Sequence, residues 1–391
     1  MTSTPASALP SASLPPLPFG QPDFGDEEIA AVTRVLRSGW VGMGPETIAF
    51  ENELAAWVEA PRVISVSSCT AALFLSLLVE GVTAGDEVVC PSLTWCSTAN
   101  AALYLGATPV FCDIAPETLC STPESLLAAV TPRTRAVIVV HYGGLAVDVE
   151  ALRNILPEGI AIIEDAAHAI GARYPNGRPV GSSGNLVCYS FYANKTLSTA
   201  EGGAIALPDG ERAERLASLR QHGLPSNAWR RYSMPKSALL APHLTELGYK
   251  CNYTDLQAAI GRVQLRRQPK LAARRLAVAE HYVAALAERW PGVHVQADIL
   301  SPDHARHLFV AILPADATIP RDELVRRCRE QGIGLSIHYP PLHRMPLYGT
   351  RPPLPVTEAV SDHIVTFPIS AAMTVTDAHR AFDVIWRASQ D

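Results

Sequence analysis

Short apolar segments alternate with helical segments between Arg62 and Glu164, and this alternation limits the possible folds more than any other feature. The strands it predicts are continuous apolar runs, which is typical of a sheet that is covered on both faces. It therefore predicts an α/β fold with a mostly parallel sheet. Two more apolar segments follow without long helices between them, so the sheet is expected to be mixed there. The expected strands are Val63–Val66, Glu87–Cys90, Pro109–Asp113, Arg135–Val140, Ile160–Glu164, Leu186–Ser190 and Ala204–Leu207.

The segments on either side of this region predict a second, smaller unit. Two helices, 26–37 and 46–59, precede the first strand and are expected to pack outside the sheet. Beyond about Glu211 a polar, arginine-rich stretch to Arg231 leads into helices 254–265 and 271–288. Strands at 307–313, 334–337 and 364–367 and helices at 321–330 and 376–388 then indicate an α+β domain. For 391 residues two domains are the natural expectation. We predict a Pro/Ser-rich arm over 1–18, a large domain over 19–250 and a small C-terminal domain over 251–391.

Composition excludes several classes of protein. Apolar residues make up 48% and charged residues 18%, with a net charge of −6. These values fit a globular chain and give no basic surface for nucleic acid or an anionic membrane. The first 18 residues hold no Lys or Arg, and no apolar run approaches a membrane span. The eight cysteines form no CxxC pair, which indicates free thiols in a reducing cytoplasm and no metal site.

One acid and one amine stand out in the centre of the chain. Asp165 comes directly after the apolar run Ile160–Glu164, and Lys195 lies thirty positions further on. Ligands of open α/β sheets sit at the carboxyl ends of strands, where Asp165 is expected. Pyridoxal phosphate (PLP) needs a carboxylate against its pyridinium nitrogen and an amine for its Schiff base. The pair therefore predicts a PLP site, with a helix N-cap as the alternative for Asp165 and a surface position as the alternative for Lys195.

The segment Ser67-Ser68-Cys69-Thr70 follows a predicted strand and opens a predicted helix. Free N–H groups at a helix N-terminus, together with the hydroxyls of Ser68 and Thr70, would bind a phosphate. An ordinary helix cap is the alternative. The Ser190 hydroxyl, five residues before Lys195, is expected to reach the same phosphate.

Three other residues have the right chemistry to hold a cofactor ring or its phosphate. Trp95 follows a strand, and its indole would stack on a pyridine ring. His168, three residues beyond Asp165, would lie over the ring or touch its phenolic oxygen. For both, a structural role is the alternative. Asn252 precedes a helix, and helix capping is its alternative.

Seven motifs, taken in order, resemble the DegT/DnrJ/EryC1/StrS family of PLP-dependent sugar aminotransferases. They are SSCTAAL, PSLTWCSTAN, GATPVFCDI, HYGG, EDAAHAIGARY, SFYANKTLSTAEGGAI and GYKCNYTDLQAAIGRVQL. The resemblance runs from about Pro18 to near the C-terminus and implies the aspartate aminotransferase fold, fold type I. PSLTWCST, YKCNYTDL and the opening PFGQPDFGDEEIAAV are most similar to the branch that makes UDP-4-amino-4-deoxy-L-arabinose.

The resemblance implies a role for each candidate. Lys195 would form the Schiff base and Asp165 would be the partner of the pyridinium nitrogen. Trp95 would stack on the ring with His168 beside it. The phosphate would be held by Ser190, Cys69 and Thr70, and by Asn252 of the other subunit of a homodimer.

This chain departs from the family pattern at two places. Cys69 stands where the family usually has Gly or Ala. Gly42-Met43 stands where the pentose branch has two threonines, whose hydroxyls would face the sugar.

The resulting hypothesis is an aminotransferase that moves an amino group from an amino acid, by family habit L-glutamate, to a keto sugar. Lys250 and Arg231 are candidates for holding the substrate phosphates, and His338 and His343 for lining the sugar pocket. A keto-cyclitol acceptor remains open. A PLP-dependent sugar dehydratase of the same fold would have histidine in place of Lys195. A protein that only senses PLP or a sugar nucleotide would not need the complete residue set. A nucleotide-binding dehydrogenase would need a GxGxxG after the first strand, which is absent.

Overall fold

A seven-stranded sheet forms the centre of the computed structural model, which describes residues 15–224, 244 and 246–390. Its order is β1-β7-β6-β5-β4-β2-β3. Neighbouring strands from β6 to β3 are parallel, and β7 is antiparallel to both β6 and β1. The prediction of a mostly parallel sheet that becomes mixed after the fifth strand is confirmed. The strands are β1 (Arg62–Val66), β2 (Glu87–Pro91), β3 (Thr108–Cys112), β4 (Thr134–Val140), β5 (Ala161–Asp165), β6 (Leu186–Ser190) and β7 (Gly203–Leu207).

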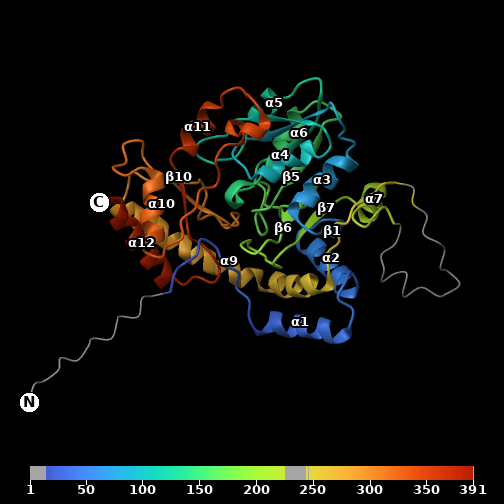
Figure 1. Cartoon of the computed structure of the whole chain (residues 1–391), viewed down its shortest axis with the longest axis horizontal. Coiled ribbons are helices and arrows are strands. Elements are labelled where there is room, and N and C mark those ends of the chain that lie inside the picture. Colours follow the sequence, from blue (N-terminus) through green and yellow to red (C-terminus); the bar gives the residue numbers. More distant parts are fainter. Residues whose placement is uncertain (1–14, 225–243, 245, 391) are drawn as a thin grey trace, which may run out of the picture.

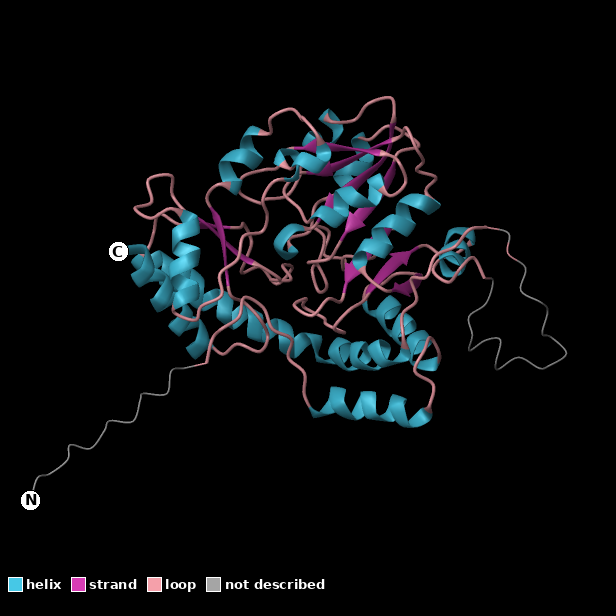
Figure 2. Ribbon diagram, in the orientation of Figure 1, coloured by secondary structure: helices cyan, strands magenta, loops and turns pink. Residues whose placement is uncertain are grey.

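Helices cover both faces of the sheet (Figures 1 and 2). Neighbouring residues of β5 show why its sequence is continuously apolar: Ile162 packs into the core on one face and Ile163 into the core on the other. The Ile163 face is covered by α3 (Cys69–Val79), α4 (Cys96–Leu103) and α7 (Glu211–Leu219). The Ile162 face is covered by α2 (Pro45–Trp57), α5 (Pro123–Ala128) and α6 (Val149–Ile155). A short 3-10 helix, η1 (Tyr142–Gly144), follows β4.

One long helix, α9 (Asp255–Arg289), runs beneath the sheet and into the C-terminal part of the chain (Figure 1). Two separate helices were expected here, but the helix continues through Pro269. Its N-terminus is closed by Thr254 and Gln257, each of which bonds the other's backbone N–H. The helix α1 (Asp26–Ser38) packs on the side of α9 away from the sheet. It therefore lies outside the sheet as predicted, whereas α2 places Phe50 in the core of the sheet.

The C-terminal part contains a three-stranded antiparallel sheet with its own apolar core. The expected strand at 334–337 is wrong. Ser336 makes only a single-residue bridge to Thr366, and Ile333 pairs with Leu17 of the N-terminal segment. The strands are β8 (His294–Val295), β9 (Phe309–Ile312) and β10 (Ile364–Phe367). The helices are α10 (Arg321–Glu330), η3 (Leu342–Arg344), η4 (Pro346–Tyr348), α11 (Pro355–Ser361) and α12 (Val375–Gln390).

The N-terminal segment is bound to the C-terminal part of the molecule. Leu17 exchanges backbone hydrogen bonds with Gly332 and Gly334, and the Phe19 carbonyl accepts from Ile369. The first fourteen residues of the predicted arm lie outside the described residues. The domain boundary near residue 250 stays a prediction. Among the described helices, none combines the length and the apolar character that crossing a membrane requires.

Candidate active site

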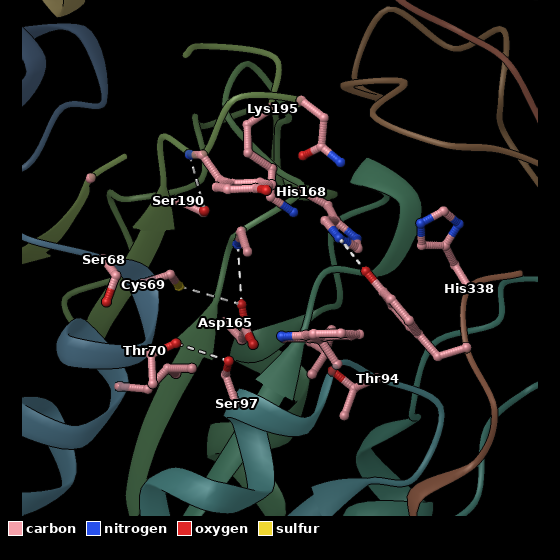
Figure 3. Close-up of a pocket in the computed structure, with 18 of the residues that line it drawn as sticks. Ser68, Cys69, Thr70, Thr94, Ser97, Asp165, His168, Ser190, Lys195 and His338 are labelled. Carbon is pink, nitrogen blue, oxygen red and sulfur yellow. Dashed lines mark hydrogen bonds between the residues drawn. The ribbon is translucent and has the colours of Figure 1, made fainter. Parts of the chain in front are cut away.

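A cavity of about 440 Å³ opens where the parallel strands end (Figure 3). Most of its wall comes from the residues just after β1, β2, β5 and β6. The end of β4, the turn before β7 and the segment at His338 and Tyr339 from the C-terminal part supply the rest. Eight of the nine predicted cofactor-site residues line it: Ser68, Cys69, Thr70, Trp95, Asp165, His168, Ser190 and Lys195.

Asp165 is the last residue of β5 and is only 6% exposed. Its Oδ2 accepts a hydrogen bond of 2.8 Å from the Thr98 hydroxyl, and its Oδ1 accepts one of 3.1 Å from the Ala167 N–H. Burial raises the pKa of Asp165, while the two hydrogen bonds and the nearby Lys195 oppose this rise. A carboxylate in such a place gains strongly from a cation placed against it.

Lys195 lies in the loop after β6 and its side chain lines the same cavity. Its Nζ lies 3.4 Å from Nε2 of His307. Burial lowers the pKa of Lys195 to about 8, against the opposing effect of Cys69 and Asp165. With a pKa of about 8, roughly a tenth of this amine is uncharged at pH 7, and nucleophilic and proton-transfer chemistry uses this uncharged form.

The first turn of α3 forms an anion cradle. Ser68 is the N-cap, and its Oγ accepts from the Ala71 N–H at 3.1 Å. The N–H groups of Cys69 and Thr70 have no partner among the described residues. A Cβ on Gly203 would lie 2.5 Å from the Ser68 carbonyl carbon, so the strand β7 can pass this turn only with glycine there. Free N–H groups at a helix N-terminus suit a phosphate.

Aromatic and imidazole groups form the opposite wall, as Figure 3 shows around His168 and His338. Trp95 is 60% exposed, and its ring centroid lies 5.8 Å from that of Tyr339. His168 Nδ1 accepts a hydrogen bond from the Gly143 N–H, so its Nε2–H donates to the Tyr339 hydroxyl at 3.1 Å. Burial and the charge of Lys195 hold the pKa of His168 well below its usual value. The ring is therefore neutral and has a fixed tautomer.

Cys69 places a thiol 3.9 Å from Asp165 Oδ1. Burial, and then the charge of Asp165, raise the pKa of this thiol well above its ordinary value. The thiol therefore stays protonated at neutral pH. The departure from the family pattern adds a weak hydrogen-bond donor beside Asp165 and no thiolate.

The model of the DegT/DnrJ/EryC1/StrS aminotransferase family matches residues 22–385. The chain belongs to this family. Among solved structures, the aminotransferase TlmJ from Streptoalloteichus hindustanus is 33% identical, with 95% of this chain and 98% of that one covered and a TM-score of 0.85. The putative sugar aminotransferase Spr1654 from Streptococcus pneumoniae, in its PLP form, is 28% identical over 96% and 99% of the chains, with a TM-score of 0.87. DesI, solved in the presence of its TDP-sugar product, is 29% identical over 97% and 94%, with a TM-score of 0.86.

The protein is thus an aminotransferase with the fold of PLP-dependent aminotransferases, and its cofactor is PLP. The cavity fits this group on its own evidence. It has N–H groups at the start of α3 that no described residue accepts from and that would suit a phosphate. It also has a buried carboxylate at Asp165 for a cationic ring nitrogen, and an amine at Lys195. The membership in the pentose branch stays a prediction.

The other residues named from the sequence lie elsewhere. Asn252 is outside the cavity, and its Oδ1 is buried without a hydrogen-bond partner among the described residues. Lys250 is exposed, and its backbone forms an isolated antiparallel β-bridge with Gln221. Arg231 lies outside the described residues. Met43 is buried in a separate cavity beside Thr47 and Glu51.

Of the two predicted sugar-pocket histidines, only His338 lines the cavity. His343 lies outside it, with its ring between Ser92 Oγ at 2.7 Å and Glu358 Oε1 at 2.9 Å.

Among the residues of the site that sequence reasoning missed are Ser97, Thr98, Tyr339 and His307. Ser97 and Thr98 belong to the motif PSLTWCSTAN, and the first turn of a helix after Trp95 would have placed their hydroxyls at the same edge as Asp165. Tyr339 follows His338 in the sequence and lines the cavity with it. His307 comes from a loop before β9 and had no sequence signal that linked it to Lys195.

Proposed function

We propose that this protein transfers the amino group of L-glutamate to the ketone of a keto sugar that is linked to a nucleotide. The observation that carries the proposal is a single cavity lined by Asp165, Lys195 and the anion cradle of Ser68, Cys69 and Thr70. Each of these groups suits one part of PLP: Asp165 the ring nitrogen, Lys195 the aldehyde carbon and the cradle the phosphate.

Each side chain has a definite task in this proposal. Asp165 would hold the ring nitrogen and favour its protonated form. The cradle at the start of α3 would hold the phosphate together with Ser190. Trp95 would stack on the ring, and the neutral His168 would hold it from the side. Bound in this way, PLP supplies an electron sink for the bond that is broken at the α-carbon of the amino acid.

Lys195 carries the proton in both halves of the reaction. Its uncharged amine would accept the proton that leaves the α-carbon of L-glutamate, and the ammonium so formed would give that proton up again within the same half-reaction. The order would be reversed when the ketone is aminated. A lysine pKa of about 8 suits the task, because the amine can hold and release a proton near neutral pH.

The acceptor is proposed from the relatives. DesI, with 29% identity, was solved with its TDP-sugar product, and we carry a nucleotide-linked keto sugar over to this chain as a proposal. Lys250 and Arg231 are the candidates for contacts with the substrate phosphates. A keto-cyclitol is the other candidate acceptor, because this chain has Gly42-Met43 where the pentose branch has two threonines.

We further propose a homodimer in which Asn252 of each subunit completes the phosphate site of the other. The support is the position of Asn252 in the motif GYKCNYTDLQAAIGRVQL, whose resemblance to the family implies this role. Its Nδ2–H would donate to the phosphate, while the buried Oδ1, which has no partner within the described part of this chain, needs a donor. An amide in this state is costly unless a neighbouring group bonds it. We expect the enzyme to act in the reducing cytoplasm.

The test uses purified protein loaded with PLP. The absorbance band of the bound cofactor should shift when L-glutamate is added, and a nucleotide-linked keto sugar should restore it. The Lys195→Ala variant should lose both changes, while the Lys270→Ala variant, which alters an exposed lysine of α9, should keep them. Full activity in Lys195→Ala would refute the mechanism. If a keto-cyclitol restored the absorbance band and no keto sugar did, the acceptor would be a keto-cyclitol.

A further inference from the structure

His307 is the single hydrogen-bond partner of the Lys195 amine among the described residues. Its Nε2 lies 3.4 Å from Lys195 Nζ. The ring is 3% exposed, and its centroid is 4.4 Å from that of His168. The backbone N–H of His307 donates to the Gly143 carbonyl at 3.0 Å, and this hydrogen bond fixes the position of the His307 backbone. The residue is therefore a buried, well-anchored group in direct contact with the proposed proton carrier.

We propose that His307 is a positioning residue that holds the Lys195 amine in the cavity whenever the amine is not bound to cofactor. This inference rests on the proposed function, in which Lys195 moves protons. It adds a residue from the C-terminal part of the chain to a site that is otherwise built mainly from the large sheet.

The chemistry follows from the state of the imidazole. Burial, then the positive charges of Lys195 and Arg275, hold the pKa of His307 well below its usual value, so the ring is neutral. A neutral ring with an unprotonated Nε2 accepts a hydrogen bond from an ammonium and from an amine alike. When the amine donates one N–H to His307, its lone pair stays free to take a proton. The contact thus serves both protonation states of Lys195.

His307 differs in this respect from its neighbour His168. His168 has both ring nitrogens engaged, by Gly143 and by Tyr339. His307 Nδ1 is buried and has no partner among the described residues. Within the described part of the chain, the one polar contact that its ring makes is therefore the contact with Lys195.

The groups around Lys195 determine the expected direction of change. Asp165 and the protonated Cys69 thiol face it from β5 and α3, and the neutral rings of His168 and His338 face it from the opposite wall. Arg275 lies behind His307. If the imidazole is removed, the ammonium loses its hydrogen-bond acceptor in a poorly solvated place, so the pKa of Lys195 should fall further.

The test compares three variants of one residue. Glutamine carries a polar atom at about the position of Nε2, asparagine carries one at about the position of Nδ1, and leucine carries neither. In the apoprotein, the rate of reductive methylation of Lys195 is followed by mass spectrometry as a function of pH. His307→Leu and His307→Asn should lower the midpoint by about one pH unit, and His307→Gln should leave it within about 0.3 units.

The loaded enzyme gives a second measurement. With L-glutamate and L-glutamate deuterated at the α-carbon, His307→Leu and His307→Asn should lower kcat at least about tenfold, because a misplaced group loses most of its effectiveness. KM should stay within about twofold, and the isotope effect should rise because proton transfer becomes rate-limiting. His307→Gln should lose less than about threefold.

Equal methylation midpoints in all four proteins would overturn the inference, as would an equal loss in the Gln and Asn variants. If His307→Leu does not fold, the Gln and Asn variants decide by themselves, because both keep a polar side chain of similar size. The apoprotein measurement needs no substrate. If L-glutamate failed as donor, the proposed function would be refuted. The contact between His307 and Lys195 would still be tested by the methylation midpoints of the apoprotein.

Discussion

Thr98 in the first turn of α4 donates a hydrogen bond of 2.8 Å to Asp165 Oδ2 at the end of β5. The Thr98 hydroxyl is in turn 2.9 Å from that of Thr94. Together with the Ala167 N–H on Oδ1, this arrangement favours the charged form of a carboxylate that burial would otherwise protonate. A protonated Asp165 could not hold a pyridinium nitrogen. The Thr98 hydroxyl therefore affects cofactor binding through Asp165, without needing to touch the cofactor itself.

Replacement of Thr98 by valine should therefore weaken PLP binding. The change keeps the shape and removes one hydrogen bond to a charged group, which is worth about 1.5–3 kcal/mol. The pKa of Asp165 should rise, so affinity should fall at least about tenfold and fall most at low pH, where more of the carboxyl is protonated. Titration of the apoprotein with PLP between pH 6 and pH 8.5, followed by absorbance, measures this. Thr98→Ser is the matched control, because it keeps the hydroxyl that donates to Asp165. Equal affinities for Thr98→Val and wild type would contradict the assigned role.

Gly203 tests the anion cradle. A Cβ there would lie 2.5 Å from the Ser68 carbonyl carbon and 2.6 Å from the Cys69 nitrogen, which are backbone atoms that cannot move away cheaply. Gly203→Ala should displace the first turn of α3 and lower the affinity for both PLP and inorganic phosphate at least about tenfold, a loss of about 1.4 kcal/mol. Calorimetric titration of the apoprotein measures both.

Gly292→Ala is the control for this substitution, since its Cβ would make only ordinary contacts with Pro314, at 3.6 and 3.9 Å. A Gly203→Ala protein that is as stable as wild type and binds phosphate equally well would show that the anion binds elsewhere.

The parts of the site that sequence reasoning found share one physical cause. Three of the predicted residues stand at or just after the end of a strand: Asp165, Ser68 and Ser190. The carboxyl ends of parallel strands meet at one edge of the sheet, so predicting parallel strands was enough to bring these residues together. The apolar runs were long enough to locate those ends within one or two residues. Local pattern was therefore enough to assemble this side of the cavity.

The other side of the cavity depends on contacts between distant segments. His307 and Tyr339 lie in loops whose positions are set by how the C-terminal part packs against the large sheet. The spacing of apolar residues in the sequence does not predict this packing. The prediction of two helices, 254–265 and 271–288, failed for the same reason. The helix α9 continues through Pro269 and packs on α1 through Ala259 and on α12 through Val278, on either side of the proline. Packing at both ends outweighs the hydrogen bond that the proline cannot make.

Lys195 is expected to lower the stability of the apoprotein. Its pKa is about 8 in the fold and 10.5 as the ordinary value, so the folded chain binds fewer protons than the unfolded chain between these values. By linkage, stability then rises with pH through this window, and the full cost is present below pH 8. The shift corresponds to up to about 3 kcal/mol.

Lys195→Met should accordingly be about 1–3 kcal/mol more stable than wild type at pH 7, with the difference shrinking by pH 10. Urea unfolding of the two apoproteins at both pH values measures the change. Lys270→Met, at an exposed position of α9, controls for the general effect of losing a charge. A difference between wild type and Lys195→Met that does not depend on pH would mean that the amine is not desolvated.

The two histidines of the segment HYPPLH should separate into a site residue and a structural residue. His338 lines the cavity, and its Nδ1 lies 2.9 Å from Thr366 Oγ1. His343 is buried outside the cavity between Ser92 and Glu358. Its hydrogen bond is the largest of the effects that hold the pKa of Glu358 down at about 2. Loss of the His343 ring would break a chain that joins the end of β2 to α11.

His343→Ala should therefore lower the melting temperature by several degrees and leave the KM values of both substrates within about twofold. The reason is that the buried Ser92 hydroxyl loses its partner on the ring, which costs about 1–3 kcal/mol. The stability that Glu358 adds is present above pH 4.5 and is lost as the pH falls through about 2, so the difference in stability between wild type and His343→Ala should shrink over that range. His338→Ala should do the opposite, with a raised acceptor KM and a melting temperature closer to that of wild type. Thermal melts from pH 7 to pH 3 and steady-state kinetics at pH 7.5 measure both. A raised acceptor KM in His343→Ala without a loss of stability would place His343 in the substrate pocket after all.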